Sequence, residues 1–134
     1  MKKIIEYGRY GIKLPFPCID MHGHLGRYAF AIPDMTLEAL IASMDRIGIK
    51  RYWTSHMRTM SADAEWGNQE VYKAMREYPG RILGAISVWP SDKMEVKRVV
   101  DRWLKKGFSG FKLHDSNGFP YTHPAYEFLS LIHI

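Results

Sequence analysis

The sequence predicts an α/β fold with a parallel sheet. Short apolar runs typical of strands alternate with segments of helical periodicity, and each strand–helix unit takes roughly 30 residues. The strand-like runs are rich in β-branched and aromatic residues and lie at 18–22, 49–54, 82–89 and 110–113. Because a crossover helix joins parallel strands in units of this size, we expect successive strands to pair in parallel.

The intervening helices are marked by their periodicity and by their end signals. The first has apolar residues at helical spacing over 37–47, with Thr36 as its N-cap and Gly48 as its stop. The second ends before Pro79, and the third extends from a Ser91 cap to about Lys106. The opening segment, 7–17, contains two glycines and two prolines and is expected to be an irregular lead-in to the first strand.

Length and composition favour one globular domain. The chain has 134 residues, of which 46% are apolar and 25% charged, and its single cysteine excludes an internal disulfide. The net charge is +5, and the densest group of basic residues lies at 97–106. These residues lie opposite an apolar stripe at helical spacing, which is typical of the solvent-exposed face of an amphipathic helix. We therefore expect no nucleic-acid partner. The first apolar run ends at Glu6, too soon for a signal peptide or membrane span, which favours a cytoplasmic protein without a membrane partner.

Two histidines close the first predicted strand. Side chains alternate along a strand, so Asp20, His22 and His24 are expected to share a face, with the histidine Cα atoms about 6.6–7 Å apart. Two imidazoles at this separation can bind one metal ion, and the Asp20 carboxylate can orient one of the imidazoles through a hydrogen bond. The alternative is an inert, hydrogen-bonded pair of histidines at a polar strand end.

The segment 18–26 (Cys-Ile-Asp-Met-His-Gly-His-Leu-Gly), followed by β/α units and by Gly-Phe-Lys-Leu-His at 110–114, resembles the amidohydrolase superfamily. The likeness is to the amidohydrolase-related group, which includes decarboxylases and hydratases of small acids, and it extends from about Pro15 to Tyr126. It implies a (β/α)8 TIM-type barrel. Since a complete barrel takes about 250 residues, residues 1–128 would form its N-terminal half, roughly the first four β/α units.

The same resemblance implies a divalent metal, most often zinc with manganese as an alternative, bound by His22 and His24. The parent protein would be a hydrolase or lyase that acts on a small carbonyl or carboxylate compound through metal-activated water. Further ligands would come from later strands, so this chain is expected to be inactive alone. A metal-free lactonase-like enzyme and a non-catalytic basic binding module are the alternatives. Homo-oligomerisation is left open.

Lys112 and His114 share a face of the fourth predicted strand and are candidate catalytic residues. In some branches of the superfamily a lysine at this strand end is carboxylated and bridges two metals, whereas a cationic Lys112 would bind a substrate carboxylate. A merely structural ion pair is the third interpretation. We expect the substrate-binding role.

The last six residues, 129–134, are expected to be a non-native tail. Their sequence, Leu-Ser-Leu-Ile-His-Ile, is the translation of a transposase mosaic-end sequence used in sequencing libraries, so adapter read-through or a frame error would explain it. The preceding residues also leave no room for the crossover helix that a next parallel strand needs. His133 is therefore not counted as a metal ligand.

Overall fold

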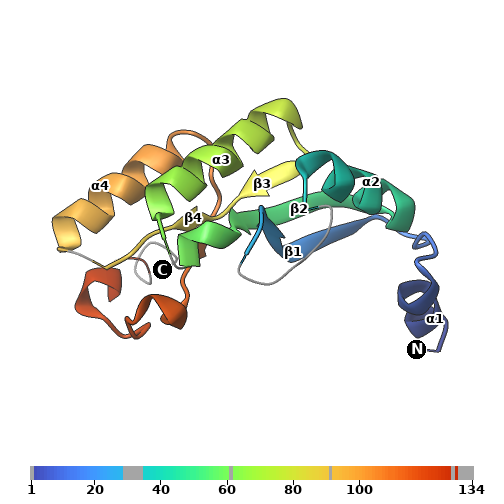
Figure 1. Cartoon of the computed structure of the whole chain (residues 1–134), viewed down its shortest axis with the longest axis horizontal. Coiled ribbons are helices and arrows are strands. Elements are labelled where there is room, and N and C mark those ends of the chain that lie inside the picture. The colour runs from blue at the N-terminus through green and yellow to red at the C-terminus, as the bar shows by residue number, and fades with distance from the viewer. Residues whose placement is uncertain (1, 29–34, 61, 91, 128, 130–134) are drawn as a thin grey trace.

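The computed structural model describes residues 2–28, 35–60, 62–90, 92–127 and 129 (Figure 1). In chain order their elements are α1 (Lys2–Tyr10), β1 (Cys18–Leu25), α2 (Leu37–Ile47), β2 (Ile49–His56), the 3-10 turn η1 (Met57–Met60), α3 (Ala64–Glu77), β3 (Ile82–Gly84), β4 (Ile86–Ser87), α4 (Lys93–Leu104), β5 (Phe111–Lys112), and the 3-10 turns η2 (Asp115–Asn117) and η3 (Pro124–Tyr126).

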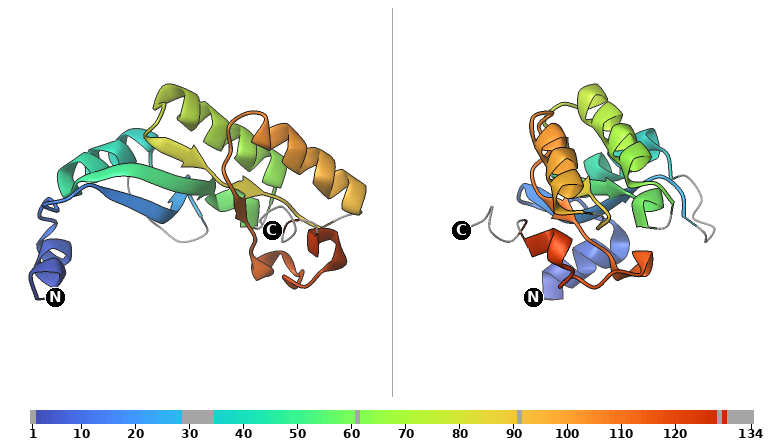
Figure 2. Two further views of the ribbon diagram at one scale, coloured as in Figure 1. Left: turned by 180° about the vertical axis from the view of Figure 1, so that it is seen from behind. Right: turned by 90° about the vertical axis from the view of Figure 1, so that its left-hand side faces the viewer.

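The strands pair in parallel, as the alternation of strands and helices predicts. One sheet has the order β1-β2-β3 and the other consists of β4 and β5. The two sheets follow one another because only Ala85 separates β3 from β4, and the Ala85 N–H donates to the Thr54 carbonyl at 2.8 Å. Helices α2, α3 and α4 lie on one side of the strands, whereas α1 stands apart beyond the start of β1 (Figures 1 and 2).

The expected (β/α)8 TIM-type barrel is contradicted. The described strands form two separate sheets of three and two strands, and neither sheet closes on itself. Closure requires the last strand to pair with the first at a consistent tilt and stagger. Among the described strands, however, β5 pairs only with β4, and each of these two strands is two residues long. The chain is thus a small α/β structure with open parallel sheets.

The predicted helix ends agree with the structure for α2 and for the end of α3, which stops at Glu77 before Pro79, whereas the starts of α1 and α4 differ. Thr36 accepts the Ala39 N–H as N-cap of α2, and Gly48 ends the helix with a φ of 89°. The N-cap of α4 is Asp92 instead of Ser91, which lies outside the described residues. Helix α1 corrects the expectation of an irregular start over 7–17, because the helix extends to Tyr10 before that segment loses regular structure.

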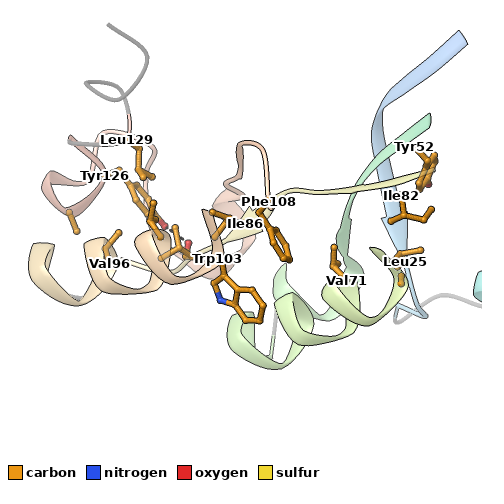
Figure 3. Packing of buried hydrophobic residues seen from close by; sticks show 14 of the residues in the cluster. Leu25, Tyr52, Val71, Ile82, Ile86, Val96, Trp103, Phe108, Tyr126 and Leu129 are labelled. Carbon is orange, nitrogen blue, oxygen red and sulfur yellow. Dashed lines mark hydrogen bonds between the residues drawn. The ribbon is translucent and has the colours of Figure 1, made fainter. Parts of the chain in front are cut away.

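The hydrophobic core lies between the strands and the helices and continues from one sheet to the other (Figure 3). Trp103 of α4 is fully buried, with its ring centre 5.0 Å from that of Phe108, and its indole N–H donates to Glu65. Leu129, the first residue of the predicted non-native tail, is also buried in this core, whereas the rest of that tail, 130–134, lies outside the described residues.

The surface of α4 carries ion pairs. Lys97 pairs with Asp101, and Arg102 pairs with Glu65 of α3, so part of the positive charge of this helix is compensated. In the part of the chain that the structure describes, no helix combines the length and apolar character needed to cross a membrane.

A buried amide explains why the predicted strand at 82–89 ends at Ser87. Asn68 of α3 is almost fully buried; its side-chain amide donates to the Ser87 carbonyl at 2.8 Å, and its oxygen accepts the Ser87 N–H at 2.9 Å. The Ser87 hydroxyl then donates to Thr59 of η1 at 2.9 Å. The Asn68 side chain therefore satisfies the backbone of Ser87 where a neighbouring strand would otherwise do so.

We expect Asn68→Ala to lower the free energy of unfolding by about 2–4 kcal/mol, because it leaves the N–H and carbonyl groups of Ser87 buried without these partners. Urea unfolding followed by circular dichroism measures the loss. Lys73→Ala is the control, since Lys73 is exposed and forms a surface ion pair with Glu70, and it should cost less than about 1 kcal/mol. Equal losses in the two variants would contradict this account of β4.

Candidate functional site

The two histidines of the first strand lie at its carboxyl end, next to a β-bulge. Asp20 pairs with Tyr52 of β2 and Gly23 pairs with Thr54, so β1 uses three steps where β2 uses two. The extra residue breaks the simple alternation from which a common face was predicted. His22 and His24 nevertheless lie close together, with ring centres 5.3 Å apart and ring planes at 69°.

Asp20, the predicted orienting carboxylate, contacts the backbone. Its Oδ1 atom accepts the backbone N–H of His22 at 2.9 Å. This contact stabilises the chain inside the bulge, where the N–H would otherwise lack a ladder partner. Asp20 therefore acts on the position of His22 through the main chain, whereas the sequence led us to expect a contact with an imidazole.

Lys112 of β5 joins the histidine pair from the other sheet. Its Nζ atom lies 2.9 Å from Nε2 of His22, although the two residues are 90 positions apart in the sequence. An ammonium group only donates, so Nε2 of His22 is the acceptor and directs its lone pair toward a cation. Burial lowers the pKa of the Lys112 amine.

His114, the other predicted catalytic candidate, is held in a turn. Its Nδ1 atom accepts the Ser116 N–H at 3.1 Å and caps η2. His114 is close enough for its charge to act on His24. The structure thus brings His22, His24 and Lys112 into one cluster. His114 lies beside this cluster, and its ring accepts a hydrogen bond from the backbone of η2.

Burial and nearby cationic groups keep His24 neutral. Burial first, and then the charges of Lys112, His22 and His114, lower the pKa of His24 to about 4, while Asp20 acts in the opposite direction. The buried Ser55 of β2 lies beside the ring, with its hydroxyl oxygen 3.4 Å from Nδ1. A neutral imidazole retains the lone pair that a metal or a substrate proton requires.

Sequence reasoning missed two residues of β2 that shape the site, Ser55 and Tyr52, although it noted that Gly23 gives the backbone room between the two histidines. The Tyr52 hydroxyl accepts the backbone N–H of His24 at 2.8 Å, and burial raises the pKa of Tyr52, so the group stays protonated. A Cβ atom at Gly23 would lie 1.9 Å from Cζ of Tyr52, so the tyrosine ring needs this glycine. The glycine between the two histidines was the available signal, whereas nothing local to β2 indicated Tyr52.

A cavity adjoins the site between β1 and α2. Its volume is about 510 Å³, and its walls include His24 and Tyr52 on the strands and the small side chains of Ala39 and Ser43 on the helix. This volume falls in the range of small-molecule pockets. Because α2 forms one wall, the cavity lies on the helix side of the sheet.

The spacing of the two imidazoles can be compared with the spacing of histidine ligands on one zinc ion. Two imidazoles bound through nitrogens at about 2.0–2.1 Å to one tetrahedral zinc ion place their ring centres roughly 5 Å apart. The 5.3 Å observed for His22 and His24 fits that spacing. Within the described residues, no group of three or more His, Cys, Asp or Glu side chains is placed to hold a metal ion. The pair therefore fits two of four ligand positions.

Comparisons with protein-family models, with curated proteins and with solved structures found no match to this chain.

The depressed pKa of His24 predicts a pH dependence. Its folded-state value of about 4 lies below the ordinary 6.5, so the unfolded chain binds the proton more tightly. The contribution of His24 to stability is therefore complete above about pH 6.5 and is lost as the pH falls toward 4. Histidine NMR titration, together with urea unfolding at several pH values, measures both effects.

Lys112→Met should raise the pKa of His24 by removing a positive charge, but not to 6.5, because burial is the larger cause. Lys105→Met, on the exposed end of α4, is the matched control and should leave His24 unchanged. Titration of His24 near 6.5 in the unsubstituted folded chain would contradict this description of its surroundings.

Proposed function

We propose that this chain carries the metal-binding histidines of a metal-dependent hydrolase or lyase related to the amidohydrolase-related group. His22 and His24 would bind a divalent ion, with zinc expected and manganese as the alternative, and the substrate would be a small carbonyl or carboxylate compound. One observation supports the proposal: the ring centres of His22 and His24 lie 5.3 Å apart, and the ammonium group of Lys112 lies within hydrogen-bonding distance of a ring nitrogen of His22.

The position of Lys112 supports a cation site. The ammonium group sits 2.9 Å from Nε2 of His22, so the lone pair of this ring nitrogen already faces a cation, although burial lowers the pKa of the amine. A metal ion bound at this nitrogen would displace the ammonium group, because both need the same lone pair. The displaced Lys112 would remain beside the ion and could bind an anionic group of the substrate as a point charge.

The other residues contribute position and environment. A bound divalent ion would polarise a substrate carbonyl and make a water molecule more acidic. Asp20 holds the backbone of His22 in the bulge, and Ser55 lies beside the His24 ring.

The proposed partners are a small molecule and a second copy of the chain. Within the described residues β1 is an edge strand, and its Ile19 and Met21 side chains are 51% and 60% exposed. Apolar side chains on an open edge favour pairing with another chain. A single cysteine and no disulfide favour a cytoplasmic location.

Metal titration of the 134-residue chain tests the proposed function. We expect one Zn²⁺ or Co²⁺ per chain, bound weakly because two protein ligands supply half of a tetrahedral site. His22→Ala and His24→Ala should each weaken binding by at least about tenfold, since each removes a ligand. Equilibrium dialysis or Co²⁺ absorption provides the measurement.

His123→Ala is the control, because His123 caps η3 and should not alter metal binding. Binding that survives both ligand substitutions, or no binding at all, would overturn the proposal. Turnover of a small lactone that persists in chelator would instead favour the metal-free lactonase-like alternative, in which the histidines contact the substrate directly.

Lys112→Met separates the two functional roles of this lysine. If Lys112 is a cation, as we propose, its removal frees Nε2 of His22 and relieves repulsion, so Co²⁺ should bind more tightly than to the unsubstituted chain. If Lys112 is carboxylated, the same substitution removes an anionic ligand, so Co²⁺ binding should weaken. Added bicarbonate should then strengthen Co²⁺ binding to the unsubstituted chain but not to Lys112→Met. Dialysis with Lys105→Met as the charge-matched control decides between them, and weaker binding by Lys112→Met would refute the cationic role.

A further inference from the structure

One hydroxyl group links the central strand to the end of β1 that carries the histidines. The Tyr52 hydroxyl accepts the His24 N–H at 2.8 Å and lies 3.4 Å from the carbonyl oxygen of the same residue. A single side chain from β2 therefore engages both backbone polar groups of His24. Asp20 provides the corresponding contact for the backbone N–H of His22.

The tyrosine ring is held rigidly where this contact is made. Tyr52 is 9% exposed and belongs to the hydrophobic core beside Leu25 and Ile82 (Figure 3). Its ring packs directly against the backbone of Gly23, where an added Cβ atom would come within 1.9 Å of Cζ. Because packing restricts the ring, the hydroxyl has little freedom to leave His24.

The bulge makes such a contact necessary. One of the two register shifts between β1 and β2 lies between Asp20 and Gly23, directly before His24. A bulge disrupts the ladder locally, and a further slip by one residue would turn His24 to the opposite face of the sheet. The spacing of the two imidazoles thus depends on what holds the backbone after the bulge.

We propose that Tyr52 is a positioning residue, whose hydroxyl holds the His24 backbone so that the imidazoles of His22 and His24 converge on one ion. This inference rests on the proposed metal function of the histidine pair. Tyr52 acts through His24 and does not itself touch the ion. Gly23 has a matching role, since its missing side chain admits the tyrosine ring.

Tyr52→Phe tests the inference, because it removes the hydroxyl and keeps the ring. We expect Co²⁺ affinity to fall by about tenfold, the range seen when a group that orients a metal ligand is lost. The visible absorption of the bound Co²⁺ should change as the ligand geometry changes. In the metal-free chain, the His24 amide proton should exchange with solvent faster than in the unsubstituted chain.

Tyr126→Phe is the matched control. Tyr126 is also buried, and away from the histidines its hydroxyl donates to the Val88 carbonyl at 3.2 Å and contacts the Asn117 side chain. Both variants remove a buried hydroxyl that contacts the backbone, so both should lower the free energy of unfolding. Only Tyr52→Phe should weaken Co²⁺ binding and expose the His24 amide.

The outcomes separate this inference from the proposed function. If His24→Ala weakens Co²⁺ binding but Tyr52→Phe behaves like Tyr126→Phe, the positioning role is wrong and the metal function stands. If the unsubstituted chain binds no Co²⁺ through the histidines, both proposals fail. Gly23→Ala provides a second variant, because it displaces the tyrosine ring by contact and should reduce Co²⁺ affinity as Tyr52→Phe does.

Discussion

The structure depends on the parallel pairing of β2 with the strands on both sides of it. β2 pairs with β1 over most of its length and with β3 through three residues, so it holds the first sheet together. Its alternating side chains divide between the two faces of that sheet: Thr54 and His56 are buried on the helix side, and Ser55 lies by His24 on the other. The same strand therefore builds the core and the candidate site.

The second constraint is the short path that joins the two sheets. At Ala85 the chain leaves its pairing with β2 and continues as β4 beside β5, and the Ser109 N–H donates to the Gly84 carbonyl at 2.9 Å. This continuity brings Lys112 to within hydrogen-bonding distance of His22. The amine of Lys112, the imidazoles of His22 and His24 and the hydroxyl of Ser55 thus lie together at the carboxyl ends of strands from both sheets. Ligand sites commonly form at this position in α/β proteins.

Electrostatics and packing at this cluster favour a neutral His24 beside a positive Lys112. The depressed pKa of His24 arises mainly from burial, and Lys112 adds to it. Positive charge is accepted at Nε2 of His22, because an imidazole lone pair points there. A metal ion bound at this nitrogen would take the place of the ammonium group, and this replacement is the physical basis of the proposed metal function.

Local patterns predicted α2, α3, α4 and the parallel strand pairing and singled out the two histidines, but they did not predict α1. The Thr36 cap and the Gly48 stop define α2 through interactions a few residues apart, so the sequence was sufficient there. The barrel was wrong, because closure depends on strand length and stagger, which no local pattern encodes. The bulge in β1, the Tyr52 contact with His24 and the approach of Lys112 to His22 were also decided only by the tertiary structure. The Tyr52 and Lys112 contacts join residues at least 28 positions apart in the sequence, and the bulge arises from the pairing of β1 with β2. Packing between distant segments of the chain selects such contacts.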